Sequence, residues 1–259
     1  MKLNNLVMRG GVLVVLLSLL VVGCKGVSSG DTSAWTENTN KKKVWEKTNS
    51  SGTEYLRAYE QFGSTTKPDE VEVKLTVGNA AKSKAGLIFD LRKNDNDTLN
   101  YFVVGVGTQA ANGTTPEYYI SYYSGVTADS IAQTSSGEAA PQGSGTTKTI
   151  QNNRAFSEAS VPGLSVAADG SLTVYLYVKA DADDPTKIKV SASATGGVNY
   201  TELKTFDLND YDAGADKIKG GIAAYAMLRP TESSGSSVST KNTYEVLKPT
   251  VIASAEDAE

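Results

Sequence analysis

The feature that most constrains this chain is a strict alternation of apolar and polar side chains. In the first such segment, Val71, Val73, Leu75 and Val77 occupy every second position, and polar residues lie between them. A period of two is typical of a β-strand, in which successive side chains point to opposite faces. No segment has a long helical period, so the pattern predicts an all-β fold. Strands are expected at 71–77, 87–91, 102–106, 118–122, 172–178, 188–194, 222–228 and 243–247.

Clean alternation is typical of antiparallel sheets that bury one face and expose the other to water. Two such sheets packed face to face share one core, which predicts a two-sheet jelly-roll sandwich over residues 34–250. Within it, residues 124–151 are poor in apolar side chains and rich in Ser, Thr and Gly. We expect them to form a long loop or an insertion. Residues 251–259 are expected to be an acidic tail.

Composition excludes several classes of mechanism. The 259 residues include no histidine and one cysteine. Without imidazole there can be no Ser-His-Asp or Cys-His hydrolysis and no His-ligated zinc. One thiol excludes an intrachain disulfide. A net charge of −4 argues against a nucleic-acid partner, which would require a basic surface.

The single cysteine, Cys24, directly follows a short apolar segment near the N-terminus. Lys2 and Arg9 make the start basic, and residues 12–22 form an apolar run of eleven residues. A helix needs about 20 residues to span a bilayer, so the run predicts a signal peptide over 1–23 rather than a membrane span. A small, polar tether follows at 24–33. Cleavage would remove two basic residues and no acidic one, which takes the net charge from −4 to −6.

The residues around Cys24 resemble a bacterial lipobox. Gly23 and Cys24 match its small residue and cysteine, whereas Val21 stands where leucine is usual, so the segment is similar to the relaxed lipoboxes. The resemblance implies that Cys24 is acylated and anchors the protein to a membrane. Lys25 replaces the aspartate associated with inner-membrane retention. An outer-membrane lipoprotein, on the surface or periplasmic side, is therefore expected.

Three short motifs carry a second resemblance. They are Ala-Gly-Leu-Ile-Phe at 85–89, Tyr-Phe-Val-Val at 101–104 and Gly-Gly-Ile at 220–222. Their order over roughly residues 55–250 resembles the concanavalin A-like lectin/glucanase sandwiches, in particular their laminin-G-like bacterial branches. The chain lacks the Glu-x-Asp-x-(x)-Glu arrangement of the catalytic members. The resemblance thus implies a concanavalin A-like sandwich that acts as a non-catalytic binding module for glycan or protein ligands.

Tyrosines on the polar strand faces are the candidate binding residues. Tyrosine is amphipathic and tolerates an exposed sheet face, where its ring can stack on a sugar. The alternative is that these tyrosines only fill cross-strand pairs or lie under loops. The predicted binding residues are Tyr119, Tyr123, Tyr175, Tyr177 and Tyr225, with Asp90, Arg92 and Arg229.

A calcium site is a further candidate. Asp181, Asp183 and Asp184 supply hard oxygen ligands in one loop, as calcium requires. The laminin-G-like resemblance implies that a cation at a loop rim would be usual. Aspartates are also common in turns for backbone reasons, so both interpretations stay open. No other cofactor is expected.

Two further functions remain open at this stage. Glu70 and Glu72 fall on one strand face, about 7 Å apart by strand geometry. Glycoside hydrolysis uses two carboxylates at such separations, so a hydrolase or lyase of the glucanase-like class is one alternative. A structural or assembly subunit of an envelope complex is the other.

Overall fold

The computed structural model describes residues 36–37, 44–49, 58–61, 70–93, 98–109, 113–127, 131–133, 139–141, 145–211, 221–228 and 240–248. Cys24, Arg229, the expected signal peptide, the tether and the acidic tail lie outside the described residues. In the described part of the chain, no helix is long and apolar enough to cross a membrane.

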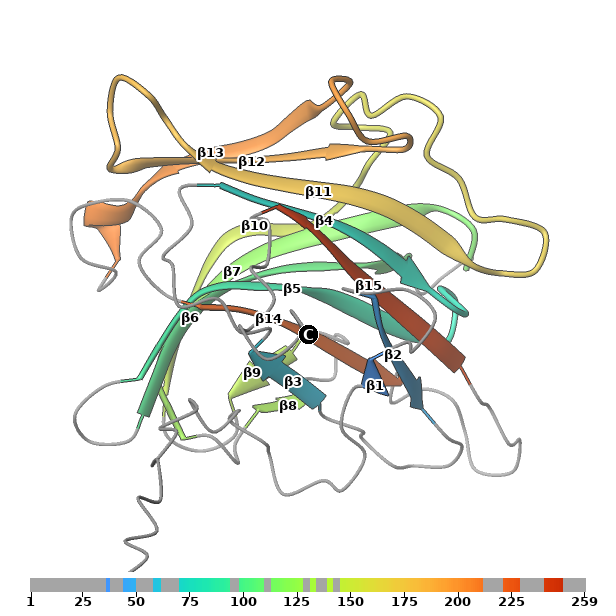
Figure 1. Cartoon of the computed structure of the whole chain (residues 1–259), viewed down its shortest axis with the longest axis horizontal. Helices are drawn as coiled ribbons and strands as arrows, with labels where there is room; N and C mark the ends of the chain where they lie inside the picture. The colour runs from blue at the N-terminus through green and yellow to red at the C-terminus, as the bar shows by residue number, and fades with distance from the viewer. Residues whose placement is uncertain are drawn as a thin grey trace, which may run out of the picture.

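In the part of the chain that the structure describes, two large antiparallel sheets pack on each other (Figure 1). The seven-stranded sheet has the order β1 (Thr36–Glu37), β2 (Val44–Asn49), β15 (Thr240–Lys248), β4 (Glu70–Val77), β11 (Leu172–Ala180), β12 (Lys187–Ser193) and β13 (Thr201–Asp207). The six-stranded sheet has the order β10 (Thr146–Ala155), β7 (Pro116–Thr127), β6 (Thr98–Thr108), β5 (Ser83–Lys93), β14 (Gly221–Leu228) and β3 (Ala58–Gln61). A short hairpin of β8 (Ile131–Gln133) and β9 (Ala139–Pro141) is separate.

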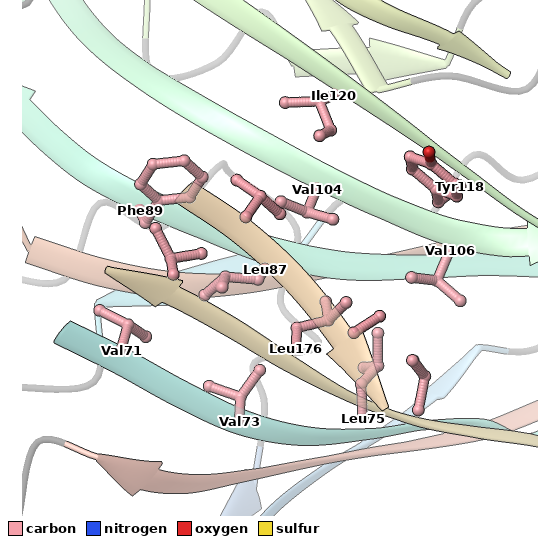
Figure 2. Close-up of a cluster of buried hydrophobic side chains, with 14 of the residues drawn as sticks. Val71, Val73, Leu75, Leu87, Phe89, Val104, Val106, Tyr118, Ile120 and Leu176 are labelled. Carbon is pink, nitrogen blue, oxygen red and sulfur yellow. The ribbon is translucent and has the colours of Figure 1, made fainter. Parts of the chain in front are cut away.

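The two sheets pack face to face through the alternating apolar residues (Figure 2). In the seven-stranded sheet, Leu75 lies opposite Val174 and Val71 opposite Val178 in the β4–β11 register. Phe89 and Val104 enter the same core from the six-stranded sheet. Most of the side chains that the alternation places inward are buried there. The predicted all-β, antiparallel two-sheet sandwich is thereby confirmed.

Phe102 joins the two sheets at one end of the core. Its ring centroid lies 5.2 Å from that of Phe89, 4.7 Å from that of Tyr122 and 5.2 Å from that of Phe206. Phe206 belongs to β13, the edge strand of the other sheet. Tyr211 closes the cluster with its ring edge against Phe102 at 5.5 Å. The aromatic cluster therefore ties β13 to the middle of the six-stranded sheet.

The expectation of one wet face per sheet is wrong for the six-stranded sheet. Along β6 every described side chain after Thr98 is buried, whichever face it points to. Tyr119 and Tyr123 alternate with the core residues Tyr118 and Tyr122 on β7 and are buried as well. On this outer side β9 contacts β7 and β10, and Figure 1 shows the β8–β9 hairpin on the far side of the sheet, so the hairpin covers part of this face.

The segment 124–151 contains more strand than the expected loop or insertion. β7 continues to Thr127, the β8–β9 hairpin follows, and β10 begins at Thr146. β10 pairs with β7 from Thr146 to Ala155, with register shifts on either side of Gln151. Its first four side chains are exposed, so a sheet edge can form here from Thr and Lys residues without an apolar pattern.

We expect Phe102→Ala to lower the free energy of unfolding by about 3–5 kcal/mol, because it removes a fully buried ring and leaves a cavity. Urea denaturation measures the change. Val198→Ala is the control, since Val198 is 94% exposed and should cost less than about 0.5 kcal/mol. A Phe102→Ala effect as small as that of the control would contradict the packing described for this cluster.

Candidate functional site

The outer face of the seven-stranded sheet carries the candidate site. Glu70, Glu72 and Lys74 of β4 alternate with core valines and a leucine, so they point away from the other sheet. Tyr175 and Tyr177 of β11 do the same. The β4–β11 register places Tyr177 opposite Glu72. Two strands thus bring acids, a lysine and tyrosines to one surface.

Three of these residues form a connected cluster with Tyr200, which precedes β13, and Lys248, which ends β15. We call Glu70, Glu72, Tyr177, Tyr200 and Lys248 the Glu–Tyr–Lys cluster. The Tyr177 hydroxyl donates a hydrogen bond to Glu70 Oε2, and the Tyr200 hydroxyl donates one to Glu72 Oε1 at 2.7 Å. The two tyrosine rings pack with centroids 5.1 Å apart. Lys248 Nζ lies 3.3 Å from Glu70 Oε1 and 3.8 Å from Glu72 Oε2. It also lies 5.3 Å from the centroid of the Tyr177 ring.

The contacts in the cluster shift the pKa values of Glu70, Tyr177 and Tyr200. The hydrogen bond from Tyr177 lowers the pKa of Glu70, and Lys248 lowers it further. Burial raises the pKa of Tyr177, and the neighbouring carboxylate of Glu70 adds to this. Burial and Glu72 raise the pKa of Tyr200 in the same way. At neutral pH, Glu70 is therefore ionised and both phenols keep their protons.

This protonation pattern argues against Glu70 as a proton donor at neutral pH. A glycosidase needs one carboxyl group whose pKa is raised, so that it is protonated at working pH. The pKa of Glu70 is shifted in the opposite direction. A tyrosine that acts as a base needs a lowered pKa, and both tyrosines have raised ones. The cluster presents fixed charges and hydroxyl groups on an aromatic surface.

Tyr175 extends the same surface beside the turn after β12. A Cβ atom on Gly196 would lie 2.6 Å from the Tyr175 ring, and Gly196 has φ +74°, so only glycine fits this close approach. Lys74 Nζ lies 5.7 Å from the centroid of the same ring. The turn leads through Val198 to Tyr200. The backbone of this turn therefore connects the Tyr175 position to the Glu–Tyr–Lys cluster.

The candidate tyrosines are divided between the two sheets. Tyr175 and Tyr177 belong to the seven-stranded sheet, whereas Tyr119, Tyr123 and Tyr225 belong to the six-stranded one. The backbone of Tyr225 lies between Tyr59 of β3 and Gly86 of β5; its side chain is outside the described part of the chain.

Tyr119 and Tyr123 are enclosed with charged groups. Tyr123 packs on Tyr101 with centroids 5.2 Å apart, and Lys84 Nζ lies 5.5 Å from the centroid of the Tyr119 ring. Lys84 is 1% exposed and is paired with Glu117 at 3.0 Å. Buried ions of this kind need a partner, because desolvation is costly. These tyrosines fill a closed layer, as the cross-strand alternative allowed, and do not form an open binding face.

Asp90 and Arg92 meet at a bulge near the end of β5. The register with β6 shifts between Phe89 and Arg92, and Asp90 has φ +51°. Asp90 is buried, and its Oδ2 lies 3.1 Å from Arg92 Nη2. The bulge brings the two predicted binding residues together as an ion pair within the six-stranded sheet, away from Tyr175 and Tyr177.

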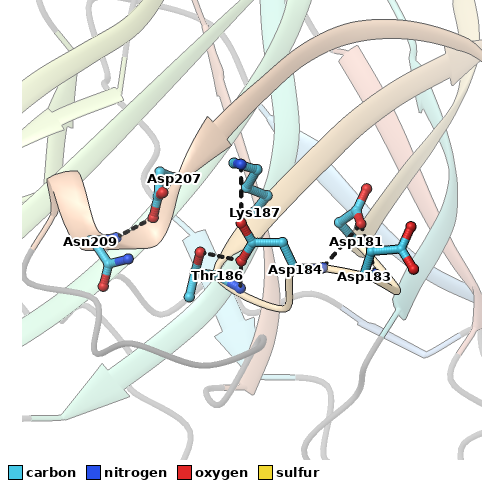
Figure 3. A network of polar contacts seen from close by, with 7 residues as sticks. All are labelled: Asp181, Asp183, Asp184, Thr186, Lys187, Asp207 and Asn209. Atoms are coloured by element: carbon cyan, nitrogen blue, oxygen red, sulfur yellow. Dashed lines mark hydrogen bonds and ion pairs between the residues drawn. The ribbon is translucent and has the colours of Figure 1, made fainter.

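The predicted calcium ligands lie in the loop between β11 and β12 (Figure 3). Asp181 Oδ1 accepts hydrogen bonds from the backbone N–H groups of Asp183 and Asp184. Asp184 accepts from the Thr186 hydroxyl at 2.6 Å and pairs with Lys187 Nζ at 3.0 Å. These bonds are those of a self-contained turn. Among the described residues, no group of three His, Cys, Asp or Glu side chains is placed to hold a metal ion; the calcium site stays a prediction.

Tyr200 and Lys248 are the members that sequence reasoning missed. Tyr200 precedes β13 and Lys248 ends β15, so neither lies within a recognised alternation. Lys248 reaches Glu72 only because the β15–β4 register shifts between Val246 and Lys248. The sequence signal for Tyr200 was its position shortly after the Gly196-Gly197 turn.

The lowered pKa of Glu70 predicts how stability depends on pH. A carboxyl group whose pKa is lower in the folded state stabilises that state at pH values above its ordinary pKa, which is 4.5. The contribution is lost as the pH falls through the lowered value. Glu70→Gln should therefore reduce the free energy of unfolding at pH 7, with the difference from wild type shrinking in increasingly acidic buffer. Urea titrations over this range measure the difference.

Glu158→Gln is the control for this series, because the side chain of Glu158 is 60% exposed in its pair with Arg154. Exposed pairs contribute little to stability, so this variant should follow wild type throughout. A Glu70→Gln difference that grows as the pH falls would contradict the interaction described for Glu70.

No family model matches the chain, and no curated protein matches it. Among solved structures it is similar to a β-glucanase of Bacillus licheniformis, at 10% identity and a TM-score of 0.43, over 85% of this chain and 86% of that one. A tetrameric galectin from the ball sponge Cinachyrella sp. is similar at 11% identity and a TM-score of 0.34, over 72% of this chain and 94% of that one. An alginate lyase in complex with an alginate tetrasaccharide is similar at 11% identity and a TM-score of 0.34, with 78% of each chain covered. Likenesses this distant carry no argument about activity.

Proposed function

We propose that the protein is a lipid-anchored, non-catalytic binding module of the cell envelope, which holds a glycan or protein ligand on the outer face of its seven-stranded sheet. The observation that carries the proposal is the Glu–Tyr–Lys cluster, in which two tyrosines fix two carboxylates on a sheet face that has no second layer of described strands. Tyrosine-rich surfaces with a few fixed polar groups are typical of recognition sites.

The titration of the cluster supports binding over catalysis. An ionised Glu70 and protonated phenols provide hydrogen-bond acceptors and aromatic surface, and none of the three is poised to donate a proton as a general acid at neutral pH. The hydrolase or lyase alternative would need Glu70 and Glu72 to act as an acid and a base. Release of sugar from a polysaccharide panel by wild type, abolished in Glu70→Gln, would favour that alternative.

Binding is tested with the folded protein on a glycan array and a panel of matrix and envelope proteins. We expect Tyr177→Ala to weaken binding of the ligand found by at least about fivefold, the usual effect of removing an interface residue worth more than 1 kcal/mol. Thr147→Ala is the control, because Thr147 is exposed on β10 of the other sheet. Silence on both panels, or equal losses in the two variants, would overturn the proposed binding face.

The membrane anchor is the second part of the proposal. Two or three acyl chains on Cys24 would hold the protein stably, since each buried CH₂ group contributes about 0.8 kcal/mol. The mature chain's negative charge gives no attraction to anionic lipid. In cells, Cys24→Ser should abolish incorporation of labelled palmitate and leave the protein unanchored, which detergent phase partitioning measures. Wild-type protein that takes up no label would contradict the anchor.

A further inference from the structure

Lys248 holds a position in the Glu–Tyr–Lys cluster that a ligand could take over. Its ammonium group lies between two carboxylates and beside the Tyr177 ring. Its side chain is 45% exposed, and it is the last residue of β15. A half-exposed lysine on a long flexible stem gains little from such a contact and can leave it readily.

The carboxylates have supports that do not depend on Lys248. Glu70 Oε2 accepts from Tyr177 and Glu72 Oε1 accepts from Tyr200, while the tyrosine rings pack on each other. Glu72 is 7% exposed and so has little freedom to move. If Lys248 leaves, both carboxylates keep their places. The site is therefore preorganised for a cation, and preorganisation reduces the cost of binding.

The arrangement of oxygen atoms favours an ammonium over a guanidinium group. Each carboxylate gives one oxygen to a tyrosine and its other oxygen to Lys248. A guanidinium prefers both oxygens of a single carboxylate, whereas an ammonium is a compact charge that can bridge two. Lys248 itself shows that a lysine side chain on an extended strand can reach both carboxylates.

A second lysine–tyrosine contact lies next to the first. Lys74 Nζ is 5.7 Å from the Tyr175 ring centroid, on the same face. Tyr175 and Tyr177 are two residues apart on β11, which is about 7 Å along a strand. The surface thus has two lysine–tyrosine contacts. Their spacing equals that of two side chains on the same face of an extended peptide.

We propose that the Glu–Tyr–Lys cluster is a lysine-recognition subsite, in which a lysine from an extended segment of a partner protein replaces Lys248 between Glu70 and Glu72. The inference rests on the proposed binding function and names its ligand chemistry. The two carboxylates of Glu70 and Glu72 supply the charge that complements such a lysine once Lys248 has left.

The test measures binding of pentalysine to the full chain in detergent micelles by calorimetry, in wild type and in Lys248→Gln. Removing the internal competitor should tighten binding by about three- to tenfold, the range expected for one or two exposed ion pairs. Lys241→Gln is the matched control: Lys241 also lies on β15, is 57% exposed and pairs with Glu46 at 2.6 Å. It removes the same charge away from the cluster and should tighten binding less than twofold.

Two more arms identify the site and the ligand chemistry. Adding Glu72→Gln to Lys248→Gln should reverse the tightening, with thermal unfolding of each variant showing that the fold is kept. Pentaarginine and Nε-acetylated pentalysine should bind Lys248→Gln more weakly than pentalysine does. Equal tightening in Lys248→Gln and Lys241→Gln, or equal binding of pentaarginine, would overturn the lysine subsite.

The outcome is separable from that of the proposed function. If a glycan or protein found on the panels loses binding in Tyr177→Ala while pentalysine shows no preference for Lys248→Gln, the binding face stands and the lysine subsite is overturned. If pentalysine behaves as expected and a panel protein binds through its lysines, both stand.

Discussion

Each face of a β-sheet has to be covered or made polar enough to meet water, and the rest of this structure depends on how its two sheets meet that requirement. One layer of alternating apolar side chains satisfies the inner faces of both sheets. The six-stranded sheet then carries aromatic and charged groups on its outer face and buries them too. The seven-stranded sheet instead places Lys, Glu, Thr and Tyr there. The two outer faces therefore have different roles.

The charged groups of the two outer faces illustrate the difference. The Lys84–Glu117 pair is almost fully buried, so each charge needs the other to offset its desolvation. The ion pairs of Lys248 are half-exposed, and pairs of that kind contribute only about 0–1 kcal/mol each. The first pair is part of a closed structure. The ion pairs of Lys248 are weak enough for another cation to replace its ammonium group. The hydrogen bonds from Tyr177 and Tyr200 fix the two carboxylates around that position.

The fold could be predicted from sequence because period-two alternation follows directly from strand geometry. The apolar residues at alternate positions of 71–77 and 172–178 are buried as their spacing indicates. The alternation could not reveal that Tyr119 and Tyr123 are buried on the outer face of their sheet. Tyr-Phe-Val-Val at 101–104 and the tyrosines of β7 are, however, apolar or aromatic at successive positions, and so on both faces of their strands. Apolar and aromatic residues on both faces of these strands were the sequence signal that both faces are buried.

The candidate site was only half visible in the sequence. Glu70, Glu72 and Tyr177 were recognised, but as parts of two separate hypotheses, because strand pairing across about a hundred residues is not encoded in local spacing. β10 and the position of Lys248 were missed for a related reason: the first lacks an apolar pattern, and the second depends on a register shift.

The contrast between the two outer faces is tested most directly by the accessibility of single thiols. The chain has one cysteine, so a Cys24→Ser background is thiol-free and can carry either Ser121→Cys on β7 or Lys179→Cys on β11. Ser121 is 1% exposed on the outer face of the six-stranded sheet, while Lys179 is exposed on that of the seven-stranded sheet. We predict that maleimide labels the Lys179→Cys variant rapidly in the native state and the Ser121→Cys variant only in denaturant. Native labelling of both at comparable rates would contradict the account.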